Sequence, residues 1–116
     1  MEIFVHSENA VAVSPDLERH VRGVLQSRLA RFGQRLTRVE VGFTDENGRR
    51  AGVADMRCTI EARPSGLQPF AVTADAPGLV ACFDAAAEKL ASLLSTRLGK
   101  EADHKGAASI RRPSAG

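Results

Sequence analysis

The residues of this sequence that could do chemistry are mainly arginines and lysines. They fall into two groups, one on or just after a predicted helix near the N-terminus and one on a second predicted helix: Arg19, Arg22, Arg28, Arg31 and Arg35, then Lys89, Arg97 and Lys100. Acids near the first group are confined to Asp16 and Glu18, in the first turn of its helix. Guanidinium and ammonium groups bind phosphate oxygens through charge and hydrogen bonds. Such a surface suits phosphate backbones, although scattered arginines also serve simply to keep a protein soluble.

Composition limits what that surface can bind. The 116 residues carry a net charge of only +2, which does not by itself indicate a nucleic-acid-binding protein. The chain has no Trp or Tyr and five Phe, so it offers few rings on which bases could stack. Any nucleic-acid partner is therefore expected to be contacted through its phosphates rather than its bases.

Length and hydropathy indicate one ordinary globular domain. The chain is 43% hydrophobic and 26% charged, as soluble domains of this size are. No apolar run approaches the roughly 20 residues needed to span a bilayer. The N-terminus lacks the basic and apolar regions of a signal peptide. We therefore expect a cytoplasmic protein with no membrane partner.

No arrangement of residues indicates an enzyme. The sequence has no G-x-S-x-G motif, no P-loop and no closely spaced pair of His and carboxylate. Asp45 and Glu46 form an acidic pair that is interpreted as solvated turn residues. Gly48 and Gly52 lack a phosphate-binding spacing. We expect no catalytic residue, no cofactor and no small-molecule substrate.

The cysteines and histidines do not form a metal-binding pattern. Cys58 and Cys82 are not in a C-x-x-C pair, and His6, His20 and His104 are scattered. Both thiols lie among apolar neighbours, which is typical of reduced core cysteines. The alternative is a pair formed by folding, for example Cys58 with His6, although Cys58 is predicted to face the core.

The first basic group depends on a helix that begins at Ser14-Pro15-Asp16. Ser is a favoured N-cap, Pro a favoured first residue, and an acid suits the first turn. Apolar residues at 17, 21, 24, 25, 29 and 32 have the spacing of an amphipathic helix, and Gly33 is expected to end it. Arg28 projects from within this apolar stripe. There it either extends over the edge of a sheet or is held ready for a partner.

The second helix is predicted from about residue 78 to residue 98, with Asp75 available to cap it and Gly99 to close it. Lys89, Arg97 and Lys100 lie within about 80° of one another on its outer side. Two helices side by side would bring their basic residues to one outer surface. The apolar stripe of this helix consists of Leu79, Cys82, Phe83, Ala86, Leu90, either Leu93 or Leu94, and Leu98.

Alternating apolar and polar residues predict four strands, at residues 2–6, 37–44, 55–63 and 70–74. The last two form a hairpin around Pro64-Ser65-Gly66, with Arg57, Glu61 and Arg63 on its polar face. A strand–helix–strand start implies a parallel pair, and the later short turns imply antiparallel pairs. Because every strand alternates, one sheet face is wet and both helices cover the other. The expected fold is α+β, in the order β-α-β-β-β-α, with a four-stranded mixed sheet and two helices packed on one face.

This domain is expected to occupy residues 1–100. From Glu101 to Gly116 the periodicity disappears, and Ala, Ser, Gly, Pro and scattered charge predict a disordered tail.

Several segments form a specific layout through their order and spacing, although none is decisive alone. They are the opening strand, Ser14-Pro15-Asp16-Leu17, Arg28-Leu29-Ala30-Arg31-Phe32, Thr37-Arg38-Val39-Glu40-Val41, Asp45-Glu46-Asn47-Gly48, Asp55-Met56-Arg57-Cys58, Glu61-Ala62-Arg63-Pro64, Phe83-Asp84 and Glu88-Lys89-Leu90. Over about residues 2 to 100 this layout resembles the ribosome hibernation-promoting factor family, the ribosome-associated translation inhibitors formerly described as sigma-factor modulation proteins.

The resemblance implies a domain that lodges between the head and body of the small ribosomal subunit. There it would contact rRNA and overlap the positions of mRNA and tRNA, so that it inhibits translation by occlusion in stress or stationary phase. The chain resembles the short type of the family, without the C-terminal domain that lets long members pair ribosomes, and a monomer is expected. The RNA-binding residues that the resemblance implies are Arg22, Arg28, Arg31, Arg57, Lys89 and Arg97.

Two regions depart from the family pattern. Met56 stands where a Lys often precedes the Arg of the third strand, and the second helix is less basic than usual after Lys89. Both changes remove phosphate contacts. The alternative function is therefore a regulatory protein–protein interaction module on the same fold, with weak or lost ribosome binding. In it, the second helix or the wet sheet face would meet a protein partner.

Overall fold

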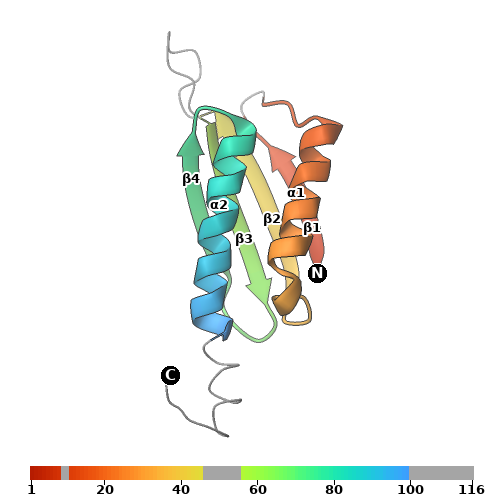
Figure 1. Cartoon of the computed structure of the whole chain (residues 1–116), viewed down its shortest axis with the longest axis vertical. Coiled ribbons are helices and arrows are strands. Elements are labelled where there is room, and N and C mark those ends of the chain that lie inside the picture. Colours follow the sequence, from red (N-terminus) through yellow and green to blue (C-terminus); the bar gives the residue numbers. More distant parts are fainter. Residues whose placement is uncertain (9–10, 46–55, 100–116) are drawn as a thin grey trace, which may run out of the picture.

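A computed structural model of the chain describes residues 1–8, 11–45 and 56–99. Its elements follow the predicted order β-α-β-β-β-α (Figure 1). They are β1 (Glu2–Ser7), α1 (Pro15–Arg28), a 3-10 turn (Ala30–Phe32), β2 (Leu36–Asp45), β3 (Met56–Pro64), β4 (Phe70–Ala76), α2 (Leu79–Leu94) and a π turn (Ser95–Gly99). The predicted Asn47-Gly48 turn, Glu46, Gly52, Asp55, Lys100 and the tail at 101–116 lie outside the described residues.

The strands form one mixed sheet in the order β1-β2-β3-β4. β1 and β2 are parallel, and the other two pairs are antiparallel, as the sequence predicts. The register aligns apolar positions across the sheet, with Val5 beside Val41, Val41 beside Ile60, and Ile60 beside Val72. Both helices lie side by side on the face that these residues form (Figure 1).

The core lies between this sheet face and the two helices. Buried strand residues alternate with exposed ones, and the helix stripes pack over them. On α2 the sequence left Leu93 and Leu94 as alternatives. Leu94 is fully buried and Leu93 only partly, so Leu94 continues the stripe. The core members contributed by the helices and turns are Leu17, Val21, Leu25, Leu29, Phe32, Cys82, Phe83, Ala86, Ala87, Leu90, Leu94 and Leu98.

The start of α1 is as predicted, but its end is not. The Leu17 N–H donates to the Ser14 hydroxyl at 3.0 Å, which makes Ser14 the N-cap. The helix ends at Arg28 rather than at Gly33, whose φ of −55° is helical and not the left-handed value of a glycine cap. A 3-10 turn follows, and it places Leu29 and Phe32 in the core. Arg28 is therefore exposed, and the prediction that it projects within the apolar stripe is wrong.

The start of α2 also differs from the prediction. Gly78 is the N-cap residue and no side chain caps the helix, so Asp75 is not its cap. Asp75 lies within β4 and accepts hydrogen bonds from Arg57 instead. The strand continues two residues beyond its predicted end at Ala74, because β3 offers partners as far as Met56.

Both cysteines are buried in the core. Burial raises the pKa of the Cys82 thiol to about 11 and raises that of the Cys58 thiol further still. His6 lies on the opposite, open face of the sheet, so it does not pair with Cys58. Within the described ranges, neither helix has the length and apolar character that crossing a bilayer requires.

Candidate nucleic-acid interface

Both helices finish at the lower end of the molecule in Figure 1, and several arginines lie at or just after these helix ends in the sequence. The Arg35 guanidinium donates to the Leu98 carbonyl at 3.5 Å, and the Ser65 N–H donates to the Arg35 carbonyl at 2.8 Å. These bonds join the chain after α1, the end of α2 and the β3–β4 turn. The cationic residues of this arginine end are Arg28, Arg31, Arg35, Arg63 and Arg97.

Three arginines of this end expose donors to solvent. Arg28, the last residue of α1, is exposed and has no hydrogen bond or ion pair to any described residue. The Arg31 guanidinium lies 4.8 Å from the centre of the Phe32 ring, and that of Arg97 lies 5.4 Å from the Phe70 ring. A ring holds a guanidinium by cation–π attraction while its N–H groups still point outward. Such groups are ready to bind phosphate.

The carbonyl ends of α1 and α2 also favour cations here. The unpaired carbonyls in the last turn of a helix carry partial negative charge, which nearby arginines offset. The arginine end therefore concentrates positive charge without nearby carboxylates to neutralise all of it. Among the described residues, Glu61 of β3 contacts one member of this end, Arg63, at 3.6 Å.

The opposite end of the molecule carries several carboxylates, most of which are paired with a cation. Asp16 lies in the first turn of α1, Asp45 ends β2, and Asp75 lies near the end of β4. Asp84 lies in the first half of α2, where it pairs with His20 of α1 at 2.8 Å. Asp16 contacts Arg19 and Asp75 contacts Arg57, so carboxylates and cations are paired at this end.

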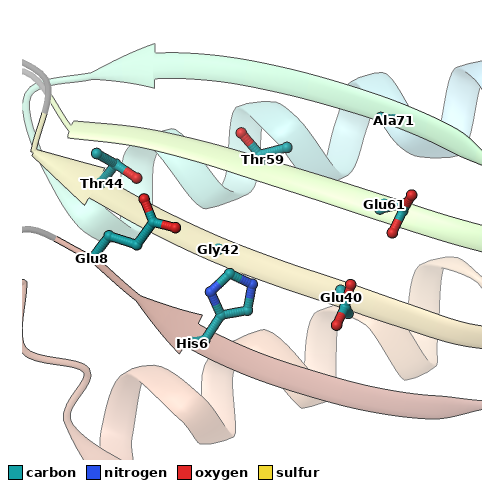
Figure 2. Close-up of a pocket in the computed structure, with 8 residues that line it drawn as sticks. All are labelled: His6, Glu8, Glu40, Gly42, Thr44, Thr59, Glu61 and Ala71. Carbon is teal, nitrogen blue, oxygen red and sulfur yellow. The ribbon is translucent and has the colours of Figure 1, made fainter.

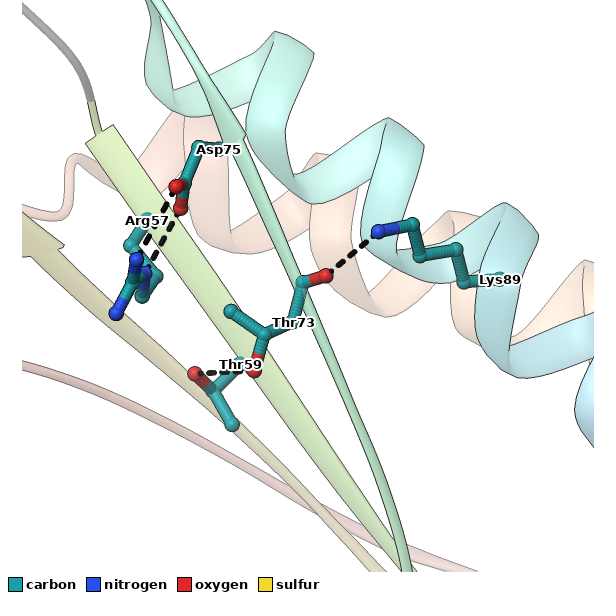
Figure 3. A network of polar contacts seen from close by, with 5 residues as sticks. All are labelled: Arg57, Thr59, Thr73, Asp75 and Lys89. Atoms are coloured by element: carbon teal, nitrogen blue, oxygen red, sulfur yellow. Dashed lines mark hydrogen bonds and ion pairs between the residues drawn. The ribbon is translucent and has the colours of Figure 1, made fainter.

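Arg22 and Lys89 do not join the arginine end. Arg22 donates to the Ile3 carbonyl of β1 at 3.1 Å and to the Glu18 carboxylate at 2.9 Å. Lys89 donates to the Thr73 carbonyl of β4 at 2.9 Å (Figure 3). β1 and β4 are the two edge strands, so these cations lie at opposite edges of the sheet. The prediction that the helices bring all their basic residues to one outer surface is wrong, because long side chains at the outer sides of the helices reach the nearest edge carbonyls.

Arg57 lies on the other side of the molecule, on the open face of the sheet. It donates to both carboxylate oxygens of Asp75, at 2.8 and 3.1 Å (Figure 3). The hydrogen bond from Arg57 and its positive charge hold the pKa of Asp75 below its usual range. Arg57 is therefore separated by the whole sheet from the exposed arginines of α1.

The open face holds a hollow of about 360 Å³, lined by His6, Glu8, Glu40, Gly42, Thr44, Thr59, Glu61 and Ala71 (Figure 2). The His6 ring lies over Gly42, where an added Cβ would come within 2.7 Å of its Cε1 atom. Glu40 and Glu61 are direct cross-strand neighbours. Each has an arginine beside it, since Arg38 contacts Glu40 at 2.7 Å and Arg63 contacts Glu61 at 3.6 Å. Carboxylates in the hollow repel phosphate, so this face fits RNA less well than the arginine end does.

The sequence placed Arg35 in the first basic group, although not among the RNA-binding residues that the resemblance implies, and it did not identify Arg63 as a member of the candidate site. Arg35 follows the helix and Arg63 precedes the hairpin turn. The signal that could have identified them is a basic residue in or beside a turn that lies next to a helix end. Among the described residues, no group of three or more His, Cys, Asp or Glu side chains could hold a metal ion.

Comparisons with known proteins agree with the predicted layout. Residues 3–101 match the family model described as Sigma 54 modulation protein / S30EA ribosomal protein. None of the curated protein sequences matches the chain. Two solved structures share its fold. The Protein Y N-terminal domain of Thermus thermophilus has 21% identity and a TM-score of 0.67, covering 83% of this chain and 98% of that one. A ribosomal subunit interface protein from Coxiella burnetii has 17% identity and a TM-score of 0.63, covering 85% and 99%.

Proposed function

The chain belongs to the Sigma 54 modulation protein / S30EA ribosomal protein family, and from this premise we propose that it is a ribosome-binding factor that inhibits translation. It binds the small subunit where mRNA and tRNA pass, and it silences the ribosome by occlusion rather than by a reaction. The names of the two structural neighbours, one of them a ribosomal subunit interface protein, support this assignment. The site of action is the cytoplasm, where ribosomes work.

The arginine end is the observation that carries this proposal. Exposed residues Arg28, Arg31 and Arg97 lie at the end of α1 or in the turns that follow α1 and α2, and the guanidinium groups of Arg31 and Arg97 lie over aromatic rings. They bind rRNA phosphates, which are fixed in position by the folded rRNA. Base recognition is not needed, because a buried position in the subunit is specified by shape and by the pattern of phosphates.

The relation between affinity and salt gives the first test. Each phosphate that a cation neutralises contributes about 0.7 to 0.9 to the slope of log affinity against log salt. Three exposed arginines therefore predict a slope of roughly −2 to −3. Cosedimentation with purified small subunits over a salt series measures it. Absence of binding at low salt, or binding that is indifferent to salt, would contradict the proposal.

Competition tests the occlusion mechanism separately. Small subunits loaded with mRNA and tRNA should exclude the protein, and the protein should prevent later loading of either. A mutually exclusive pattern supports occlusion at the decoding region. Simultaneous binding would place the protein elsewhere on the subunit and would overturn this part of the proposal.

A further inference from the structure

The outer edge of β4 presents a row of backbone groups that no strand of the described residues covers. The Thr73 carbonyl points away from β3, because it accepts the hydrogen bond of Lys89. In an antiparallel pair, successive residues alternate between facing the partner strand and facing away. Ala71, Thr73 and Asp75 therefore direct their N–H and C=O groups outward along the edge. A backbone partner is what such a row of groups fits.

β4 itself carries few of the features that usually block an edge. It has seven residues, no Pro, Lys or Arg, and no break in its register with β3. Of the described side chains, that of Lys89 closes the edge, because its ammonium group binds the central outward carbonyl. A carbonyl oxygen has two lone pairs, so an incoming N–H can bind the Thr73 carbonyl before Lys89 leaves it for a new partner.

A groove lies on the side of α2 that carries Lys89. Its volume is about 590 Å³, and it is lined by Ala85, Glu88, Lys89, Ser92, the partly buried Leu93 and Thr96. Figure 3 shows Lys89 reaching from this side of the helix across to β4. The edge and the groove together form a strand beside a helix, a geometry that receives extended peptides in other domains.

The two edges of the sheet differ in their charge balance. At β1 the cation is Arg22, and Glu18 neutralises it at 2.9 Å. At β4 the cation is Lys89, which forms no ion pair with any residue in the described ranges. The charge of Lys89 helps to lower the pKa of Asp75 without forming an ion pair with it, so the β4 edge retains a cation that is only partly offset, beside its outward backbone groups.

We propose that the β4 edge and the α2 groove bind an extended protein segment, which adds to the sheet as a fifth strand. The segment pairs with Ala71, Thr73 and Asp75, turns a carboxylate toward Lys89 and places apolar side chains over Leu93. This site does not include the exposed arginines at the end of α1. An experiment can therefore contradict the peptide site while ribosome binding is confirmed, or contradict ribosome binding while the peptide site is confirmed.

A second copy of the chain fits this edge less well than an acidic segment does. An antiparallel pair of β4 strands centred on Thr73 would bring two Lys89 ammonium groups together at the symmetry axis, and like charges in that position repel. RNA also fits less well, because a row of alternating N–H and C=O groups beside an apolar groove matches a peptide backbone. Both occupants are outcomes of the test below.

A synthetic peptide as long as β4 is the direct probe. Threonine occupies every second position of this peptide and forms one face of the strand. Valine, glutamate and valine occupy the positions between and form the face that meets α2. We expect saturable binding at concentrations up to about 1 mM, with chemical shift changes at the amides of Ala71, Thr73 and Asp75. A peptide with lysine in place of glutamate should bind at least about fivefold more weakly. The variant Lys89→Gln should remove that discrimination.

Two controls separate strand addition from other contacts. Ala71→Pro removes an outward N–H without touching the bonds to β3, and it should weaken binding at least about tenfold, whereas Ala71→Ser should not. If Ala71→Pro fails to fold, a peptide methylated at the amides that would face β4 makes the same test on the unaltered protein. Unchanged affinity for that peptide, absence of shifts at the edge amides, self-association through β4, or the same shifts with an RNA oligonucleotide would each overturn the proposal.

Discussion

The arginine end and the two sheet edges use the same kinds of side chain in different ways. At the arginine end, Arg31 and Arg97 lie over aromatic rings, which hold the cation without consuming its hydrogen-bond donors. At the edges, Arg22 and Lys89 donate to backbone carbonyls of β1 and β4. The first arrangement leaves a cation available to a partner, and the second uses it to complete the fold.

This difference teaches that a basic residue on a helix cannot be assigned a role from its angle on the helix alone. The position of the helix over the sheet decides whether the side chain meets solvent, a ring or an edge carbonyl. The same exposed fraction, about two-fifths of the side chain for both Arg22 and Arg57, accompanies two well-bonded guanidinium groups. Lys89 is exposed, as Arg28 is, yet its ammonium group binds the Thr73 carbonyl, so exposure alone does not separate the two classes.

The largest expected effect is on ribosome binding, when the charge of two residues at the arginine end is reversed. The double variant R28E/R31E should lose at least about 100-fold in affinity for small subunits, because two phosphate contacts become repulsions. Its melting temperature should stay within about 2 °C of wild type, since neither side chain has a described polar partner.

The matched control is R19E/K89E, which changes the net charge by the same amount but at two residues outside the arginine end. It should lose less than about tenfold in affinity. Equal losses in the two double variants would mean that overall charge, and not the arginine end, drives association. Normal binding by R28E/R31E would show that another face meets the rRNA.

Next in size is the effect of removing an edge cation on stability. Arg22→Leu should lower the free energy of unfolding by about 1 to 2 kcal/mol, because the Ile3 carbonyl and the Glu18 carboxylate both lose a charged donor. Arg28→Leu should change it by less than about 0.5 kcal/mol. Urea titration of both variants measures the difference. Similar values for the two would remove the distinction between bonded and available arginines.

A smaller effect is expected in the salt dependence of binding. Arg31→Gln should reduce the slope of log affinity against log salt by about 0.7 to 0.9, the contribution of one phosphate contact. Arg57→Gln should leave the slope unchanged, because Arg57 lies on the open sheet face and is engaged with Asp75. Cosedimentation of both variants over the same salt series sharpens the comparison. A reduced slope for Arg57→Gln would add the open face to the RNA-binding surface.

The smallest effect concerns pH. Arg57 lowers the pKa of Asp75 in the folded protein, so the pair contributes stability above the ordinary pKa of 3.8 and loses it as the pH falls through the lowered value. Wild type should therefore be more stable than Asp75→Asn at neutral pH, and the gap should narrow below about pH 4. Thermal unfolding at several pH values measures this. A gap that is constant with pH would mean that the ion pair adds nothing beyond its hydrogen bonds.

Much of the fold could be predicted because strand alternation and helix caps are local signals. Ser14 caps α1 as its position predicts, and the apolar faces of β2 and β3 align as their alternation predicts. The end of α1 could not be predicted, because Gly33 is a local stop signal while the burial of Leu29 and Phe32 is a tertiary effect.

The candidate site was less predictable than the fold. Arg28 and Arg31 were identified from the helix, but Arg63 joins them only because β3 runs antiparallel to β2 and ends beside the helix termini. The bonds of Arg22 and Lys89 depend on which strands are at the edges. Strand order is a property of the assembled sheet, and no local pattern of residues encodes it.

The difference between the two ends of the molecule has a kinetic consequence. At the arginine end, Arg28 has no described polar partner, whereas at the other end Asp16 is paired with Arg19 and Asp84 with His20. The field of a large polyanion therefore attracts the arginine end more strongly than the paired charges at the other end. This attraction turns the arginine end toward RNA while the protein is still diffusing, so that a larger share of encounters begins in a productive orientation.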